Sequence, residues 1–178
     1  MHTFTIQLAF VLLLSATSAQ SKALVAAADP WPPYVDFSQV GGGFSIEIIR
    51  AALQAKGHQL IVKNVPWARA VKGVEQGVYD LLPNAWYTKE RQLKFRYSKP
   101  FAMNTMRLVV NKKNTFIYKN ESSLNNLRVG LINGASYGEK LKHAKPYEII
   151  YTASMLTNIK MLINNRIDLT IEDELGLI

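Results

Sequence analysis

Residues 134–138, with the sequence Gly-Ala-Ser-Tyr-Gly, form the strongest single motif that could carry chemistry. A G-x-S-x-G motif between a strand and a helix is typical of the nucleophile elbow of α/β-hydrolases, in which an acid and then a histidine follow the serine. The only histidine after Ser136 is His143, and it precedes both Asp168 and Asp173. Chain order therefore argues against a serine hydrolase. The glycine-bounded turn is better suited to presenting backbone N–H groups and a hydroxyl to an anion.

Other catalytic and metal-binding arrangements have little support in the sequence. The chain has no cysteine, which excludes a disulfide framework, a thiolate zinc site and a cysteine nucleophile. Its histidines, at positions 2, 58 and 143, are isolated from one another, and the acidic run at residues 172–174 lacks the ligand spacing of a calcium loop. We therefore expect a protein without catalysis, metal or other cofactor.

The composition indicates a folded protein with an excess of basic residues. Hydrophobic residues make up 48% of the 178 residues, and 21 lysines and arginines oppose 13 aspartates and glutamates, for a formal net charge of +8. This balance permits an anionic partner. The basic residues are spread along the chain and are not clustered with stacking aromatics, so we expect no nucleic-acid partner.

The N-terminus has the features of an export signal. Residues 6–14 form a short apolar run, and the small residues Thr17 and Ala19 fit a signal-peptidase site. The apolar run is shorter than the ~20 residues that a membrane-spanning helix needs. We expect residues 1–19 to be a signal peptide and the mature chain to be periplasmic; a retained membrane anchor is the alternative.

Alternating strand and helix patterns predict that the first half of the mature chain is an α/β unit. Helices with apolar faces around Ile46 and Val71 separate three expected strands, at 23–28, 60–65 and 79–82. Thr88 is positioned to cap a short helical turn, with Arg91 at the third position of that turn. Residues 107–111 are expected to be extended, and the polar stretch at 111–114 to be a boundary.

The second half repeats this pattern with an unrelated sequence. Expected strands at 127–132, 147–151 and 167–171 alternate with a short helix ending near Pro146 and with a helix capped by Thr152. Alternation of strands and helices is typical of a parallel α/β sheet. We therefore expect residues 20–110 and 111–178 to form two α/β units.

An ordered set of short motifs resembles the bacterial solute-binding proteins of family 3, the periplasmic receptors of polar amino acid ABC transporters. The resemblance covers Lys22 to Ile178 and rests on Pro32-Pro33-Tyr34, Gly43-Phe44-Ser45-Ile46-Glu47, Val65-Pro66-Trp67, Gly77-Val78-Tyr79-Asp80, Thr88-Lys89-Glu90-Arg91, residues 95–101, Leu127-Arg128-Val129-Gly130, residues 134–138 and Asn165-Arg166-Ile167-Asp168. It implies a periplasmic-binding-protein-like fold: two α/β lobes joined by a hinge, with a small-molecule ligand such as an amino acid in the cleft. It also implies a monomer that serves an ABC transporter permease in the inner membrane.

The resemblance assigns roles to individual residues. The family's carboxylate-binding arginine, in a Thr-x-x-Arg motif, falls on Arg91, whose guanidinium fork suits a carboxylate. The family's acid for the ligand ammonium falls on Asp173. The other ligand-binding positions are a hydroxyl in the second lobe, two aromatic rings and a segment before the arginine motif, which fall on Ser136, on Trp31 and Trp67, and on Asn84 and Trp86.

Two other functions fit the same resemblance: a sensor module, and a periplasmic enzyme similar to cyclohexadienyl dehydratases. Receptors for basic amino acids in the family carry an acid at the position of Ala28, with Asp29 adjacent here, so Ala28 and the positive net charge favour a neutral or acidic ligand. The family's chain returns to the first lobe, whereas this sequence stops soon after Asp173. We therefore expect an incomplete second lobe and a fragment of a longer receptor.

Overall fold

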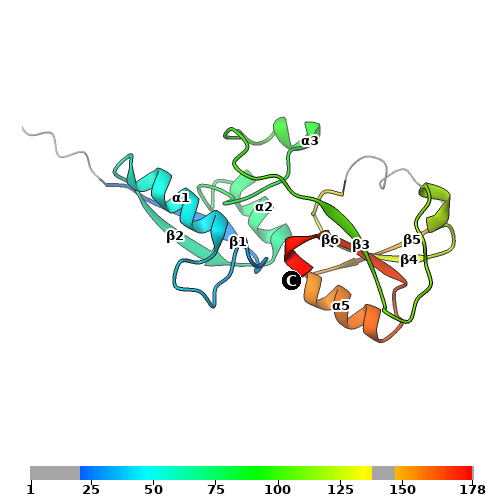
Figure 1. Cartoon of the computed structure of the whole chain (residues 1–178). Helices are drawn as coiled ribbons and strands as arrows, with labels where there is room; N and C mark the ends of the chain where they lie inside the picture. The colour runs from blue at the N-terminus through cyan, green and yellow to red at the C-terminus, as the bar shows by residue number, and fades with distance from the viewer. Residues whose placement is uncertain (1–20, 138–146, 178) are drawn as a thin grey trace, which may run out of the picture.

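The computed structural model of the chain describes residues 21–137 and 147–177. The predicted signal peptide and the predicted helix before Pro146 lie outside these residues. The described elements form two groups, on the left and right of Figure 1. We call residues 21–105 the first lobe, and residues 106–137 and 147–177 the second lobe. Within the described ranges, no helix is long and apolar enough to cross a membrane.

The first lobe is built on two parallel strands with a helix against each. β1 (Ala23–Ala28) pairs with β2 (Gln59–Asn64). α1 (Phe44–Gln54) packs against β2, and α2 (Trp67–Glu75) packs against β1. Burial of apolar side chains, at ~25 cal/mol per Å² removed from water, holds these elements together. The core cluster consists of the buried residues Ala28, Val35 and Ile46, and the partly buried Leu60 and Val62 pack against it.

The predicted third strand at 79–82 is not formed. Leu81 makes only an isolated bridge with β1. The carboxylate of Asp80 accepts the hydrogen bond of Val25 N over 2.8 Å. Pro83 has no backbone N–H to donate. The Asp80 side chain therefore takes the Val25 N–H that a longer ladder would use, and Pro83 has no N–H with which to continue the ladder. The segment extends the sheet by a single bridge.

α3 (Lys89–Gln92) begins after Thr88, as predicted. The Thr88 hydroxyl accepts a hydrogen bond from Arg91 N over 3.0 Å, and so satisfies one of the N–H groups left free at a helix start. After α3 the chain crosses to the second lobe and enters β3 (Met106–Val110), as the green segment of Figure 1 shows. The cap fixes the point from which the Arg91 side chain leaves the backbone.

The second lobe contains a four-stranded sheet in the order β3-β6-β4-β5. β4 (Arg128–Ile132) is parallel to β5 (Glu148–Thr152) and to β6 (Leu169–Asp173), whereas β3 is antiparallel to β6. The short 3₁₀ helix η1 (Glu121–Leu124) precedes β4, and η2 (Leu175–Leu177) follows β6. The core consists of Leu124, Val129, Leu131, Leu169 and Ile171.

α5 (Met155–Ile163) packs against β4, β5 and β6. Its N-cap is Ser154, whose hydroxyl accepts a hydrogen bond from Thr157 N over 3.3 Å, and is not the predicted Thr152. Thr152 is instead the last residue of β5, and its hydroxyl donates to Asn158 Oδ1 over 2.6 Å. Because β5 includes Thr152, the helix cap lies two residues further along the chain.

β3 lies before the predicted boundary at residue 110, yet it pairs within the sheet of the second lobe. Its pairing with β6 runs from Met106 opposite Asp173 to Val110 opposite Leu169. The crossing between the lobes therefore precedes β3. The assignment of residues 20–110 and 111–178 to two separate units stays a prediction.

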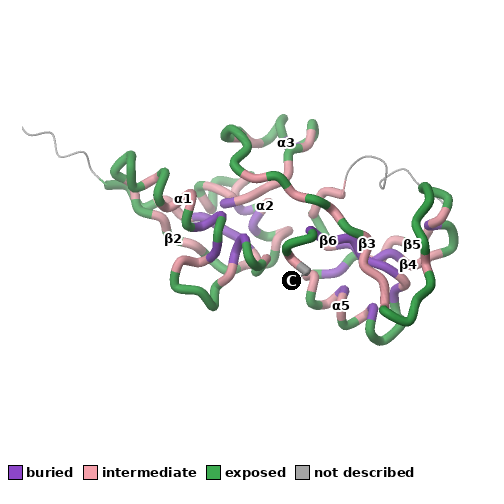
Figure 2. The backbone as a smooth tube through the Cα atoms, in the orientation of Figure 1, coloured by how far each residue is buried: buried purple, intermediate pink, exposed green. Residues whose placement is uncertain are grey.

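Each lobe has a core of its own. In Figure 2 the buried segments, in purple, occupy the sheet region of the first lobe and the central strands of the second. The two clusters of buried apolar residues share no member. The two lobes therefore do not share a core, and the side chains that they turn toward each other line the space between them.

Candidate functional site

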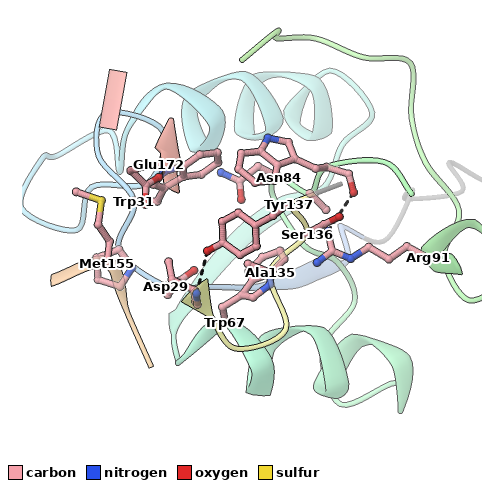
Figure 3. A pocket seen from close by; sticks show the side chains of 14 residues that line it. Asp29, Trp31, Trp67, Asn84, Arg91, Ala135, Ser136, Tyr137, Met155 and Glu172 are labelled. Atoms are coloured by element: carbon pink, nitrogen blue, oxygen red, sulfur yellow. Dashed lines mark hydrogen bonds between the residues drawn. The ribbon is translucent and has the colours of Figure 1, made fainter. Parts of the chain in front are cut away.

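A pocket lies between the two lobes (Figure 3). Its cavity volume is about 70 Å³, whereas small-molecule sites commonly have ~300–1,000 Å³. The lobes are therefore nearly closed on one another. Side chains of both lobes line the pocket: Asp29, Pro30, Trp31, Trp67, Asn84, Ala85, Trp86 and Arg91 from the first, and Ile132, Ala135, Ser136, Tyr137, Met155 and Glu172 from the second.

Most of the predicted ligand-binding residues meet at this pocket. They are Trp31, Trp67, Asn84, Trp86, Arg91 and Ser136. Asp173 is not among the lining residues. Asp29, Tyr137 and Glu172 also line the pocket, and the sequence predicted no ligand-binding role for them.

Arg91 is the cation of the pocket, and it is only 9% exposed. Its Nη1 donates to the carbonyl oxygen of Trp86 over 3.0 Å, and its Nη2 donates to the carbonyl oxygen of Gly134 over 2.7 Å. The guanidinium also lies over the Trp67 ring, 5.4 Å from the ring centroid, at a distance typical of a cation–π contact. Burial lowers the pKa of Arg91 below its ordinary value. An anion entering the pocket would meet a largely desolvated, fixed guanidinium.

The backbone carbonyl group of Gly134, on the second lobe, lies within hydrogen-bonding distance of Arg91 and Trp67 of the first lobe. Its carbonyl oxygen accepts from Arg91 and from Trp67 Nε1, the latter over 2.9 Å. Gly134 has a φ of 76°, a conformation that favours glycine. The glycine-bounded turn therefore faces the first lobe with a carbonyl group, where the sequence favoured backbone N–H groups for an anion. Ser136 of the same turn lines the pocket.

Aromatic rings form the floor and sides of the pocket. The rings of Trp31 and Trp86 meet edge to face with centroids 5.6 Å apart, and Trp86 meets Tyr137 across the lobes at 6.4 Å. The Tyr137 hydroxyl accepts a hydrogen bond from Ile132 N over 2.9 Å, and burial raises its pKa above the ordinary value. Asn84 Nδ2 is buried without a hydrogen-bond partner among the described residues. This amide is a free donor at the pocket.

Two carboxyl groups occupy the end of the pocket away from Arg91 (Figure 3). Glu172 is 4% exposed, and its Oε1 accepts from Trp31 Nε1 over 3.0 Å and from Asp173 N over 2.9 Å. Burial is the main cause that raises the pKa of Glu172, and burial raises the pKa of Asp29 to about 6. The pocket thus has a cationic end and an acidic end.

Asp173 points elsewhere. It is 0% exposed, and its Oδ1 accepts from the Tyr34 hydroxyl over 2.9 Å and from Leu175 N over 3.0 Å. Successive side chains of a strand point to opposite faces, so Glu172 lines the pocket while its neighbour Asp173 lies against Tyr34. The one sequence feature that could have indicated Glu172 as a pocket residue is its position next to Asp173 in the acidic run at 172–174.

Asp29 and Tyr137 also had weak signals in the sequence. Asp29 follows an apolar strand and precedes the rigid loop at 30–33, and Tyr137 lies inside the glycine-bounded turn. Both lie in loop segments, which often present functional side chains. Within the described residues, no three histidine, aspartate or glutamate side chains are grouped so as to hold a metal ion.

The sequence matches the family model of bacterial extracellular solute-binding proteins, family 3, over residues 24–146. The chain therefore belongs to this family. A comparison with curated proteins finds no match.

Solved structures of amino-acid-binding proteins are similar to this one. Holo ArgBP from T. maritima superposes with a TM-score of 0.78 at 18% identity, over 88% of this chain and 71% of its own. AbpA, an amino acid ABC transporter substrate-binding protein from Streptococcus pneumoniae bound to L-arginine, gives 0.77 at 22% identity, over 86% and 68%. AncCDT-1, an ancestral amino acid-binding protein and a precursor of cyclohexadienyl dehydratase, gives 0.73 at 20%, over 85% and 70%. The fold is periplasmic-binding-protein-like, as predicted.

Proposed function

We propose that this chain is an exported, non-catalytic receptor that captures an amino acid between its lobes for ABC-type transport. One observation carries the proposal: a buried guanidinium and a buried carboxylate, Arg91 and Glu172, face a single interlobe pocket from opposite ends. An α-amino acid has the complementary pair of charges. Membership of the solute-binding family and the amino-acid-binding proteins of similar fold support the same function.

The roles of the lining residues follow from their chemistry. Arg91 holds the ligand carboxylate with its fork, aided by the Ser136 hydroxyl. Glu172 accepts from the ligand ammonium in place of the predicted Asp173, because Glu172 lines the pocket and Asp173 does not. The rings of Trp31, Trp67 and Trp86 pack against the ligand body, and the Asn84 amide donates to it.

Capture would follow from binding to both lobes. A ligand that touches Arg91 on one lobe and Glu172 on the other favours the closed arrangement over the open one, and this differential contact drives closure. We further propose that the closed monomer is recognised by a membrane permease outside the cytoplasm. Family membership supports this location and this partner.

Calorimetry of the purified protein with the standard L-amino acids tests the assignment. Arg91→Ala should weaken binding on the order of 100-fold, because two charge-assisted hydrogen bonds are lost. Arg69→Ala is the matched control, since Arg69 is an exposed arginine on α2 outside the pocket. Failure of the wild type to bind any amino acid, or equal binding by Arg91→Ala, would contradict the proposal.

A dehydration reaction is a second candidate function for the same pocket. Asp29 and Glu172 have raised pKa values, and a general acid that works near neutral pH needs such a carboxyl. One similar structure is a precursor of cyclohexadienyl dehydratase. Incubation with prephenate or arogenate, followed by chromatography of the products, distinguishes turnover from binding alone.

A further inference from the structure

The second lobe has a further cavity, at the end of β6 away from the interlobe pocket. Its volume is about 580 Å³, within the ~300–1,000 Å³ of common small-molecule sites. We call it the distal pocket, and its lining is Asn111, Lys113, Asn114, Ile163, Asn165, Ile167 and Asp168. The two pockets share no lining residue. Asp168 of one and Glu172 of the other are separated by roughly 13 Å of extended chain.

The register of the sheet brings two polar turns together at the distal pocket. Val110, the last residue of β3, lies opposite Leu169, the first residue of β6. The turn at 111–114 therefore lies beside the segment that leads from α5 into β6, as Figure 1 shows. Asn165 in that segment has a φ of 54°, in the left-handed region that asparagine tolerates better than most residues. The polar stretch at 111–114, expected from the sequence as a boundary, thus forms one wall of a cavity.

Hydrogen bonds orient two of the three asparagine side chains. Asn111 Oδ1 accepts from Lys113 N over 3.1 Å, and Asn114 Oδ1 accepts from Phe116 N over 2.9 Å. Because a backbone N–H only donates, each amide gives its oxygen to the backbone and has its NH₂ group left over. Neither NH₂ group, nor the side chain of Asn165, makes a hydrogen bond to a described residue. The turn therefore uses amide acceptors and leaves amide donors.

The uncompensated charge at the distal pocket is positive. The acid of the lining, Asp168, is already held by Arg128, whose Nε and Nη2 donate to its two oxygens over 3.0 and 2.8 Å. Lys113 is exposed and has no ion-pair partner within residues 21–137 and 147–177. The neighbouring Lys112 and Arg166 are also exposed cations without an ion pair in those ranges. A negatively charged ligand would therefore be attracted here.

We propose that the distal pocket is a second ligand site, which binds a small molecule through a carboxylate or phosphate group. A fully ionised group of either kind has a negative charge and only acceptors, so it matches the amide NH₂ groups and the Lys113 ammonium. Ile163 and the buried Ile167 supply apolar surface for the carbon atoms of the ligand. Because the site lies outside the interlobe pocket, this proposal does not depend on the proposed function.

Glycerol 3-phosphate and succinate are the probes, and glycerol is the uncharged control. Each is titrated into the ¹⁵N-labelled chain and followed by amide NMR in about 0.15 M NaCl, where a Debye length of ~8 Å weakens non-specific attraction. At least one of the two anions should shift the signals of residues 111–116 and 163–168, with a millimolar or lower Kd. Glycerol at the same concentration should leave these signals in place. A response to one anion alone identifies the group that is bound.

Two substitutions test the donors separately. Asn111→Asp keeps the oxygen that accepts from Lys113 N and replaces the NH₂ group by a second oxygen, so the turn is retained while a donor becomes an anion. Asn111→Asp and Lys113→Gln should each weaken anion binding roughly 10-fold or more, because a charge-assisted hydrogen bond is lost. Lys56→Gln makes the same charge change as Lys113→Gln at an exposed site of the first lobe, and should bind as the wild type does. Thermal unfolding confirms that the variants are folded.

The outcomes separate this site from the interlobe pocket. Binding of neither anion, an equal response to glycerol, or unchanged affinity in both Asn111→Asp and Lys113→Gln overturns the proposal. Shifts confined to residues around Arg91 and Gly134 would place the anion between the lobes, and would overturn it as well. Lys113→Gln should leave amino-acid binding unchanged, so a failed amino-acid titration counts against the proposed function alone.

Discussion

The Tyr34 hydroxyl of the first lobe donates a 2.9 Å hydrogen bond to Oδ1 of Asp173 in the second. Burial raises the pKa of Tyr34 to about 12, so the hydroxyl stays a donor at physiological pH. Asp173 Oδ2 is buried and has no hydrogen-bond partner among the described residues. The pair joins the end of β6 to the loop after β1, and it keeps Asp173 out of the pocket.

Tyr34→Phe should lower the free energy of unfolding by about 1–3 kcal/mol, because the buried Asp173 carboxylate loses a donor while the ring is retained. Urea unfolding measures the change. Tyr118→Phe, at an exposed tyrosine of the second lobe, should change stability by less than ~0.5 kcal/mol. Equal effects of the two variants would show that the Tyr34 link adds nothing.

Thr88→Ala should destabilise the protein by about 1 kcal/mol and weaken ligand binding on the order of 10-fold. The substitution removes the N-cap of α3, and with it the constraint on Arg91. Thr88→Ser keeps the hydroxyl and should restore both properties. Loss of affinity in the serine variant as well would point to the methyl group instead of the cap.

The stability of the ligand-free protein should fall as the pH rises from about 4 to about 6. The pKa of Asp29 is raised to about 6 in the folded state, so the folded protein binds more protons than the unfolded chain over this range. The loss should reach up to about 3 kcal/mol, at ~1.4 kcal/mol per pKa unit. Asp29→Asn should flatten the profile measured by urea unfolding at each pH. Glu172, whose pKa is also raised, would leave a smaller slope of the same sign.

Asp168 should give the opposite pH dependence. Its carboxylate accepts from Arg128 Nε over 3.0 Å and Arg128 Nη2 over 2.8 Å, and these hydrogen bonds lower its pKa. The stabilisation is present above pH 4 and is lost as the pH falls through the lowered pKa. Because the pair is partly exposed, Asp168→Asn should cost only about 1 kcal/mol at pH 7. The variant and the wild type should converge as the pH falls below the lowered pKa of Asp168, and a constant difference would contradict this account.

Local features were predictable from the sequence, because they depend on neighbours in the chain. Thr88 and Arg91 lie within one helical turn, so the cap could be identified without knowledge of the fold. The strands at 23–28 and 127–132 are apolar runs with clear ends. The turn at 134–138 was expected to offer backbone N–H groups and a hydroxyl to an anion, whereas its described part offers the Gly134 carbonyl oxygen to Arg91 and Trp67.

Features that depend on pairing partners were not predictable. All five residues of β6 are buried, so no alternation of polar and apolar residues indicated which of Glu172 and Asp173 faces the pocket. The third strand was expected from an apolar pattern, but the contact between Asp80 and Val25 N that limits it is between residues far apart in the chain. The charges that line the pocket come from both lobes, so their balance could not be predicted before the two lobes were placed relative to each other.

The Gly134 carbonyl oxygen accepts hydrogen bonds from both Trp67 and Arg91. It therefore competes with a ligand carboxylate for the Arg91 guanidinium. A ligand carboxylate has to displace this peptide group before it can use the guanidinium fork. The measured affinity is then the intrinsic affinity multiplied by the fraction of molecules in which the fork is free. A backbone oxygen cannot be removed by a side-chain substitution, so this self-competition sets a limit on affinity that mutations of the lining side chains alone would leave in place.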